Sequence, residues 1–294
     1  MAEQIHDQAD GLRRLLMPDF VRVITVTSGS AAAGKTTTVI SLAAALAHAG
    51  KKVLIIDENV GAGNVCATLG LNAHRDLLDV IRRDKTLDEV IVASRDGIRV
   101  LPAGRGMMVL EKLSADDKAH LTSSFANIDG PVDVILIDSA PGRDSRSLPL
   151  ALSSHEIVVV VSPDPGSITA AYALMKHISG HHESKRHYHI LFNKTAREGD
   201  ARKIFDNMES VAKRYLAVTL QLLGFLPYDA KHCLGRGLAE AHPDTHSGSV
   251  FRVAAESLVN WPCQDGEGPG LERFMQSLLQ GNHNGRRNAI AANS

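Results

Sequence analysis

Eight consecutive residues, 29–36, have the types and spacing of a loop that wraps around phosphate groups. They read Gly-Ser-Ala-Ala-Ala-Gly-Lys-Thr and fit the pattern Gly-x-x-x-x-Gly-Lys-Ser/Thr without a mismatch. In such a loop, backbone N–H groups face the phosphates, the lysine pairs with the β- and γ-phosphates, and the hydroxyl ligates Mg²⁺. An apolar stretch before it and a helical pattern after it fit this interpretation better than an ordinary glycine-containing turn. The expected nucleotide contacts are Gly29, Ser30, Ala31, Ala32, Ala33, Gly34, Lys35, Thr36 and Thr37.

Two aspartates stand where apolar stretches end and could hold the metal. Asp57 follows residues 53–56, and Asp138 follows residues 134–137. A carboxylate at the end of a neighbouring strand is what holds Mg²⁺ beside such a loop. Each aspartate alone is a weak signal, because aspartate often simply ends a strand. Together with the loop they predict a magnesium–phosphate site on Thr36, Asp57 and Asp138.

The elements that must position these residues are short apolar stretches that alternate with longer helical patterns. The stretches are β-branched and apolar on both faces, which is typical of a parallel sheet covered by helices on each side. Helical periodicity extends over residues 37–49, 167–178 and 201–215. We therefore expect an α/β fold with a doubly wound, mostly parallel sheet flanked by helices. The expected strands cover residues 21–26, 53–56, 98–101, 134–137, 157–161, 189–192 and 222–226.

The chain divides into one large unit and two short ends. Residues 1–17 hold a short helical pattern that stops before Pro18. Residues 263–294 combine a glycine-rich linker, a short helix and a polar tail. On this interpretation residues 18–262 form the nucleotide-binding domain.

Charge and composition exclude several classes of protein. The 294 residues carry a formal net charge of −1, and a domain built to grip nucleic acid would carry a basic excess, so we expect no specific nucleic acid partner. The three cysteines are far apart and offer no metal-binding or redox pair. No secretory signal and no apolar run of about 18 residues is visible, which predicts a cytoplasmic location.

Two histidine pairs lie in a polar stretch between an expected helix and an expected strand. They are His181-His182 and His187-x-His189. Neither the His-Glu-x-x-His spacing nor that of a Cys/His finger is present. We therefore interpret these histidines as solvated surface residues and not as metal ligands.

The order of the motifs resembles one family of nucleotide-binding proteins. A phosphate loop, then Asp57 with Gly61 after it, then Asp138 with a Pro-Gly shortly after it, is similar to the deviant Walker ATPases of the MinD/ParA type. The resemblance covers about residues 20–260. It implies ATP and Mg²⁺ as ligands, an ATP-dependent homodimer, and peripheral contact with the inner face of the cytoplasmic membrane.

The same resemblance extends to the residues expected around the base. Residues 192–194 look like the family segment whose asparagine reads the edge of adenine, which here is Asn193. Residues 224–229 look like the proline-containing loop that flanks the base, here with Pro227 and Tyr228.

A short N-terminal segment is similar to that of one subgroup, the FlhG (FleN) proteins. Residues 7–13 match the motif DQAxxLR, which implies a regulator of flagellar number and placement. In that subgroup the segment contacts an FlhF-type GTPase and stimulates it, with the glutamine implicated, and a flagellar transcription regulator or switch component is a further implied partner. The alternative is a solvated helix with an aspartate N-cap. The expected partner-binding residues are Asp7, Gln8, Ala9, Leu12 and Arg13.

Two positions in the site depart from the family pattern. The family's loop carries a lysine that reaches across a dimer to the partner's phosphates, and Ser30 stands in its place, followed by alanines in place of two glycines. The family's second switch I aspartate activates the attacking water, whereas Asn59 can hold a water but cannot take its proton. Glu58 is adjacent, but its side chain should point elsewhere in an extended segment. The expected catalytic residues are Lys35, Asp57, Asn59 and Asp138.

These losses predict slow hydrolysis of ATP or a different dimer contact. The opposite hypothesis is a weak ATPase that uses a substitute group. Three other functions stay open: a partitioning or septum-placement ATPase of the same fold, a non-catalytic scaffold that keeps nucleotide only for folding, and, as the weakest, a small-molecule kinase or synthetase.

An apolar stripe lies on the expected C-terminal helix. Its members fall at i, i+3, i+4, i+7 and i+8. The family resemblance implies a membrane-targeting helix at this place. The alternative, that the stripe packs on the domain or under a partner chain, is slightly favoured because the charge is modest for an interfacial helix. The stripe consists of Leu271, Phe274, Met275, Leu278 and Leu279.

Overall fold

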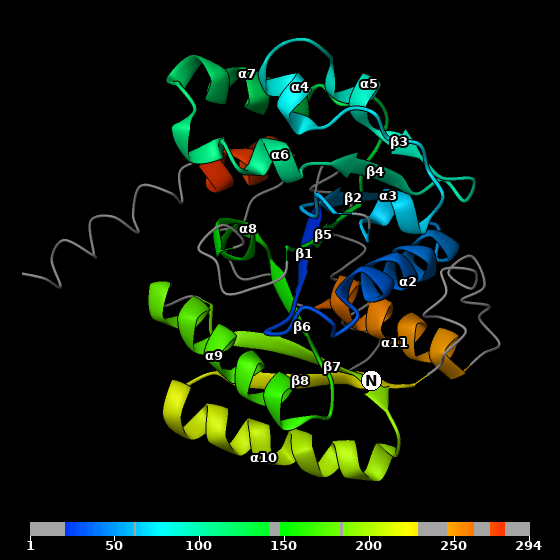
Figure 1. Cartoon of the computed structure of the whole chain (residues 1–294), viewed down its shortest axis with the longest axis vertical. Helices are drawn as coiled ribbons and strands as arrows, with labels where there is room; N and C mark the ends of the chain where they lie inside the picture. The colour runs from blue at the N-terminus through cyan, green and yellow to red at the C-terminus, as the bar shows by residue number, and fades with distance from the viewer. Residues whose placement is uncertain are drawn as a thin grey trace, which may run out of the picture.

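An eight-stranded sheet runs through the centre of this protein, whose structure is a computed structural model (Figure 1). The structure describes residues 21–61, 63–140, 148–182, 185–228, 246–261 and 271–279. The strand order is β3-β4-β2-β5-β1-β6-β7-β8, and all pairs are parallel except β3 with β4. The strands are β1 (Arg22–Thr27), β2 (Val53–Asp57), β3 (Val92–Ala93), β4 (Arg99–Pro102), β5 (Val134–Asp138), β6 (Glu156–Val161), β7 (His187–Thr195) and β8 (Thr219–Pro227).

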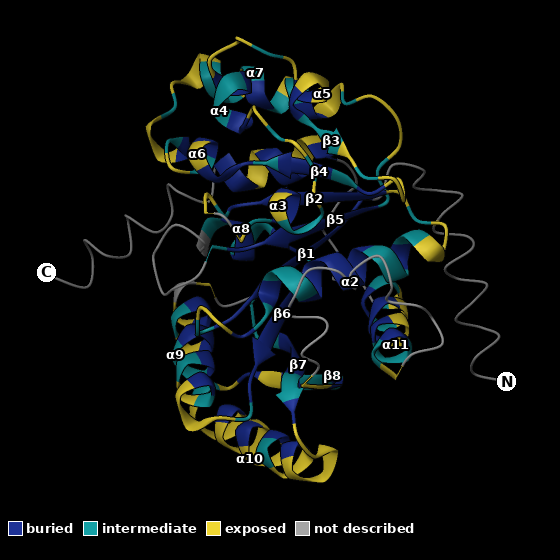
Figure 2. Cartoon of the chain, turned by 45° about the vertical axis from the view of Figure 1, so that its right-hand side comes forward, coloured by how far each residue is buried: buried dark blue, intermediate teal, exposed yellow. Residues whose placement is uncertain are grey.

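Helices cover both faces of the sheet, and the core forms three hydrophobic clusters. On one face, α2 and α11 lie side by side over the central strands. On the other face, α9 and α10 cover β6 to β8, while shorter helices cover β2, β4 and β5. Figure 2 shows the strands buried and the outer side of α10 exposed. The helices are α2 (Lys35–His48), α3 (Val65–Thr68), α4 (Leu77–Ile81), α5 (Leu87–Val90), α6 (Gly104–Met107), α7 (Ala115–Ala126), α8 (Leu148–Ser153), α9 (Pro165–His181), α10 (Glu198–Leu216) and α11 (His246–Asn260), with a 3₁₀ turn at Leu110–Lys112 and a helix at 271–279.

The expected fold class is confirmed, and all seven expected strands are present. β3 was not predicted, because two residues are too few to show a period. The sheet places the ends of β1, β2 and β5 side by side, since Val26 and Asp57 both pair with Asp138. The phosphate loop and both aspartates therefore meet at the carboxyl edge of the sheet.

The interpretation of His187 and His189 as solvated surface residues is wrong. Both lie on β7; His189 is fully buried and His187 is half-buried. The strand begins earlier than the apolar run 189–192 indicates, and inside the protein Glu156 is hydrogen-bonded to His189 while the Trp261 ring stacks on His187. His182 is exposed, as expected.

The C-terminal stripe packs on the body of the protein in this structure. All five side chains lie in the hydrophobic cluster that covers β2, β4 and β5, each at most 9% exposed. This arrangement corresponds to the packed alternative, and contact with lipid would require the helix to leave the sheet. Among the described residues, no helix is long and apolar enough to cross a membrane.

Candidate nucleotide site

The phosphate loop connects β1 to α2 and is shaped by close packing. Gly34 has a left-handed backbone with φ of 93°, which glycine adopts without strain. A Cβ atom at Gly29 would lie 2.1 Å from the backbone carbon of Ala170 on α9, so only glycine fits there. The fold therefore fixes both loop glycines, and the first turn of α2 points its N–H groups toward the loop.

The loop lysine is held in place within its own loop. The Lys35 Nζ donates a hydrogen bond of 3.1 Å to the Ser28 Oγ, and Ser28 in turn donates 2.5 Å to the backbone oxygen of Ser30. Burial lowers the pKa of Lys35, which the nearby Asp138 carboxylate opposes. Ser28 was not predicted as a site residue, since it precedes the motif.

The predicted metal ligands converge at the end of β2 and β5. The Thr36 hydroxyl donates 2.6 Å to the Asp138 Oδ2. The Asn59 Nδ2 donates 2.8 Å to the same oxygen and 3.0 Å to the Asp57 Oδ1. The second oxygen of Asp57 accepts 2.6 Å from the backbone N–H of Val65, at the start of α3. Asn59 thus bridges two carboxylates with one amide.

The electrostatics at this point favour the arrival of a cation. Burial, with the charge of Asp57 next, raises the pKa of Asp138 to about 7. Burial also raises the pKa of Asp57. The Asp138 Oδ1 is buried and has no hydrogen-bond partner among the described residues. Oxygen donors from a hydroxyl and a carboxylate suit Mg²⁺, so Thr36 and Asp138 fit a magnesium ion.

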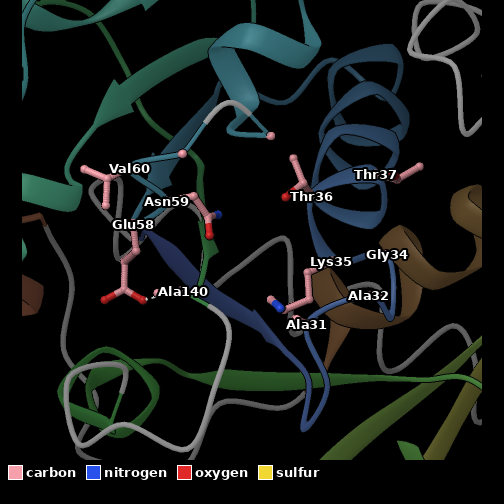
Figure 3. A pocket seen from close by; sticks show the side chains of 12 residues that line it. Ala31, Ala32, Gly34, Lys35, Thr36, Thr37, Glu58, Asn59, Val60 and Ala140 are labelled. Atoms are coloured by element: carbon pink, nitrogen blue, oxygen red, sulfur yellow. Dashed lines mark hydrogen bonds between the residues drawn. The ribbon is translucent and has the colours of Figure 1, made fainter.

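Glu58 connects the loop after β2 with the segment after β5. Its Oε2 accepts 2.8 Å from the Ala140 N–H, and its own N–H donates 3.1 Å to the Asp138 carbonyl. Figure 3 shows Glu58, Asn59 and Val60 on one side of a pocket and Lys35 and Thr36 on the other. The Glu58 carboxylate is thus directed to Ala140, while the amide of Asn59 faces the aspartates.

Two pockets adjoin the loop and share Ala32, Gly34 and Thr37. The first has a volume of about 490 Å³ and lies between the loop and Glu58 to Gly63. The second has a volume of about 260 Å³ on the other side of the loop. The predicted base contacts Asn193, Pro227 and Tyr228 all line this second pocket. Its lining also includes four residues that were not predicted, Lys194, Leu226, Ser247 and Phe251.

Asn193 and Lys194 hold the carbonyls of the phosphate loop. The Asn193 Nδ2 donates 2.9 Å to the Ala33 oxygen, and the Lys194 Nζ donates 2.8 Å to the Ala32 oxygen. The Asn193 Oδ1 accepts 2.8 Å from the Lys194 N–H, which leaves one N–H and one lone pair of the amide for a base. Lys194 was not among the predicted site residues, although it directly follows Asn193 in the sequence.

The predicted partner-binding residues 7–13 lie outside the described residues, as do residues 141–147 after Asp138. Of the predicted functional contacts in and around this site, the structure therefore describes those to the phosphates, the metal and the base, and not those to a partner protein.

Comparison with known proteins identifies the family. The model of the AAA domain family AAA_31 matches residues 21–190. The antiactivator FleN of Pseudomonas aeruginosa is 33% identical over 264 residues, covering 88% of this chain and 94% of FleN. The flagellum site-determining protein YlxH of Helicobacter pylori is 28% identical over 272 residues, covering 88% of this chain and 90% of YlxH.

Solved structures share the fold. The MinD cell division protein of Aquifex aeolicus aligns with a TM-score of 0.64 at 23% identity, over 83% of this chain and 98% of that one. The septum site-determining protein MinD of Pyrococcus horikoshii, complexed with Mg-ADP, aligns with a TM-score of 0.60 at 21% identity, over 81% and 96%. The family match spans more than half of the chain, and the likeness to FleN and YlxH spans most of it. The chain therefore belongs to the MinD/ParA-type ATPases of the AAA domain family.

Proposed function

We propose that this protein is an ATP- and Mg²⁺-binding switch that regulates the number or placement of flagella. One observation carries the nucleotide part: beside a pocket of about 490 Å³, the Thr36 hydroxyl donates 2.6 Å to Asp138, and Asn59 joins the two strand-end aspartates through hydrogen bonds of 2.8 and 3.0 Å. The flagellar part is supported by the printed names of its relatives, above all the flagellum site-determining protein YlxH. The Mg-ADP complex of a MinD supports the choice of ligand.

The switch would act through the contacts that join the two loops. A magnesium ion on Thr36 and Asp138 would place a positive charge beside the Asp138 carboxylate, in competition with the amide of Asn59 that this carboxylate accepts at rest. Release of Asn59 would free the segment that carries Val60, whose side chain is 64% exposed. Nucleotide state would thereby change the surface that a partner meets.

Hydrolysis by this site should be slow. Asn59 is hydrogen-bonded to both aspartates and has no basic atom for the attacking water. Ser30 is short and neutral; its hydroxyl lies 3.4 Å from the Ser167 Oγ of its own chain. Both positions therefore support a long-lived ATP-bound state, and the partner proposed for that state is an FlhF-type GTPase that is stimulated by residues 7–13.

Equilibrium binding by calorimetry, together with light scattering, tests the nucleotide part. ATP with Mg²⁺ should bind one site per chain, and Lys35→Ala should weaken binding at least about 100-fold because charge-assisted contacts to the phosphates are lost. Lys52→Ala, an exposed lysine after α2, is the matched control and should bind like the parent. Absence of ATP uptake by folded parent protein would refute the proposal.

A scaffold that keeps nucleotide only for folding is the second candidate, and Asn59 favours it. Affinity for the GTPase, measured with ATP, with ADP and without nucleotide, separates the two functions. A switch requires affinities that differ between the three states, whereas equal affinities indicate a scaffold.

A further inference from the structure

A second group of metal-ligating side chains lies at the opposite edge of the sheet from the nucleotide site. Glu156 is the first residue of β6 and His187 the first residue of β7, with His189 two residues further on. His187 and His189 share one face of their strand because side chains alternate. Val158 pairs with His189 in the parallel register, which places Glu156 on the same face.

The three side chains have the spacing that a small metal ion needs. Their ligand atoms all lie within 4.8 Å of one another, and the His189 Nε2 is 2.9 Å from the Glu156 Oε2. Metal–ligand bonds of about 2.1 Å in a tetrahedral site put neighbouring ligand atoms about 3.4 Å apart. The ligand atoms therefore already lie close to the separations that a bound ion requires.

Unpartnered polar atoms gather at the same place. The Nδ1 atoms of His187 and His189 are buried without a hydrogen-bond partner among the described residues, and so is the Gln221 Oε1. Gln221 lies on β8 beside His189. Burying such a group without a partner destabilises the fold, so a ligand that bonds it would be favoured here. An ion would bind one nitrogen of each imidazole, and a water on that ion could donate to Gln221.

Neighbouring charges are compatible with a divalent ion. Arg22 donates 3.2 Å to the other oxygen of Glu156, the position of an outer partner that orients a metal-bound carboxylate. The Arg22 guanidinium also donates to the backbone oxygens of Val259 and Trp261, at the end of α11, so its charge is not directed at Glu156 alone.

We propose that Glu156, His187 and His189 bind one divalent transition-metal ion of the Zn²⁺ class, with water in the remaining position. Two imidazoles and one carboxylate form a borderline donor set that suits Zn²⁺ or Co²⁺, whereas Mg²⁺ and Ca²⁺ prefer oxygen ligands alone. The ion would join β6 to β7 at their first residues. This site is separate from the nucleotide site, and its test is independent of the proposed function.

The protein contains a single tryptophan, Trp261, and it reports on this site. Its ring stacks on His187 with centroids 4.6 Å apart and meets His189 edge-on at 5.3 Å. The experiment titrates the metal-free full chain with Co²⁺ and then Zn²⁺, with Mg²⁺ in excess to occupy oxygen sites, and records Trp261 fluorescence. Co²⁺ should quench the fluorescence with one-site saturation, and EDTA should restore it.

Matched double variants decide the assignment. His187→Gln with His189→Gln should lower the Co²⁺ affinity at least about 100-fold, because two ligands are lost. His48→Gln with His74→Gln removes two exposed histidines and should leave the affinity unchanged. Should the first variant fail to fold by circular dichroism, His187→Gln alone gives the same comparison. No response of Trp261 in the parent, or equal affinities in the two variants, overturns the proposal.

Discussion

Buried carboxylates lie at both edges of the sheet, and they are neutralised in different ways. At the amino edge, Glu156 has the guanidinium of Arg22 as a partner within the fold. At the carboxyl edge, the hydrogen bonds that Asp57 and Asp138 accept within the described residues come from neutral hydroxyl, amide and backbone donors. Loss of the paired cation would leave Glu156 as an uncompensated buried charge, which destabilises a fold. The difference is therefore between a carboxylate that Arg22 already pairs and two aspartates whose hydrogen-bond donors among the described residues are all neutral.

Removing the Arg22 guanidinium at the amino edge should have the largest effect on the stability of the protein. Arg22→Met leaves Glu156 buried without its ion pair and the carbonyls at the end of α11 without their donor. Breaking a buried pair in this way costs about 3–5 kcal/mol of unfolding free energy, measured by urea denaturation. Arg202→Met breaks an exposed pair on α10 and should change stability by less than about 0.5 kcal/mol. Equal losses in the two variants would contradict the comparison.

A third carboxylate at the carboxyl edge should convert the resting site into a faster catalyst. Asn59→Asp restores a proton acceptor beside the two aspartates and removes the bridging amide. General-base catalysis contributes about 10²-fold or more, so steady-state ATP hydrolysis should rise by about that factor. Asn64→Asp makes the same change of charge on the same loop but preserves the N-cap of α3, so its rate should stay near that of the parent. No increase in Asn59→Asp would show that this asparagine is not what limits the reaction.

Neutralising Asp138 at the carboxyl edge should stabilise the protein, by less than Arg22→Met destabilises it. The folded pKa of Asp138 is raised to about 7, so its contribution to stability is largest in acid and is lost as pH rises from about 4 to about 7. In EDTA at pH 8, Asp138→Asn should therefore stabilise the protein by on the order of 2 kcal/mol. The gain should shrink at pH 5, where the parent is mostly protonated.

The exposed Asp129→Asn serves as the control for this measurement and should be neutral at both pH values. Destabilisation by Asp138→Asn at pH 8 would show that the two edges neutralise their carboxylates alike. Mg²⁺-dependent nucleotide binding should become weaker in Asp138→Asn. The carboxylate that destabilises the empty protein would then be the one that nucleotide binding requires.

The positions of the phosphate loop and the strand-end aspartates at the carboxyl edge could be predicted from the sequence, because each is encoded within a few consecutive residues. The loop around Lys35 and the aspartates that end β2 and β5 follow from residue type and strand order, since parallel strands bring their carboxyl ends together. The hydrogen bonds of Asn59 to the two aspartates could not be predicted from the sequence. The family resemblance concerns the catalytic role of this position and does not give its contacts in the absence of nucleotide.

The amino edge was misread because its contacts join distant parts of the chain. His187 and His189 alternate with apolar residues in a polar neighbourhood, and their partners lie 33 residues before them or follow α11. Helix α11 itself was missed, although Phe251, Ala255 and Leu258 recur at helical spacing in the sequence. Because the helix was not predicted, Phe251 was not predicted as a residue of the second pocket either.

The docked helix 271–279 competes with any other surface for the same five side chains. In the structure Met275 and Leu278 are each 1% exposed against the sheet, so a lipid bilayer could receive them only by uncovering that face. The apparent affinity for a bilayer is then the intrinsic affinity scaled by the small fraction of molecules whose helix is detached. Anything that loosens this intramolecular competitor would raise membrane affinity without adding a single new contact to lipid.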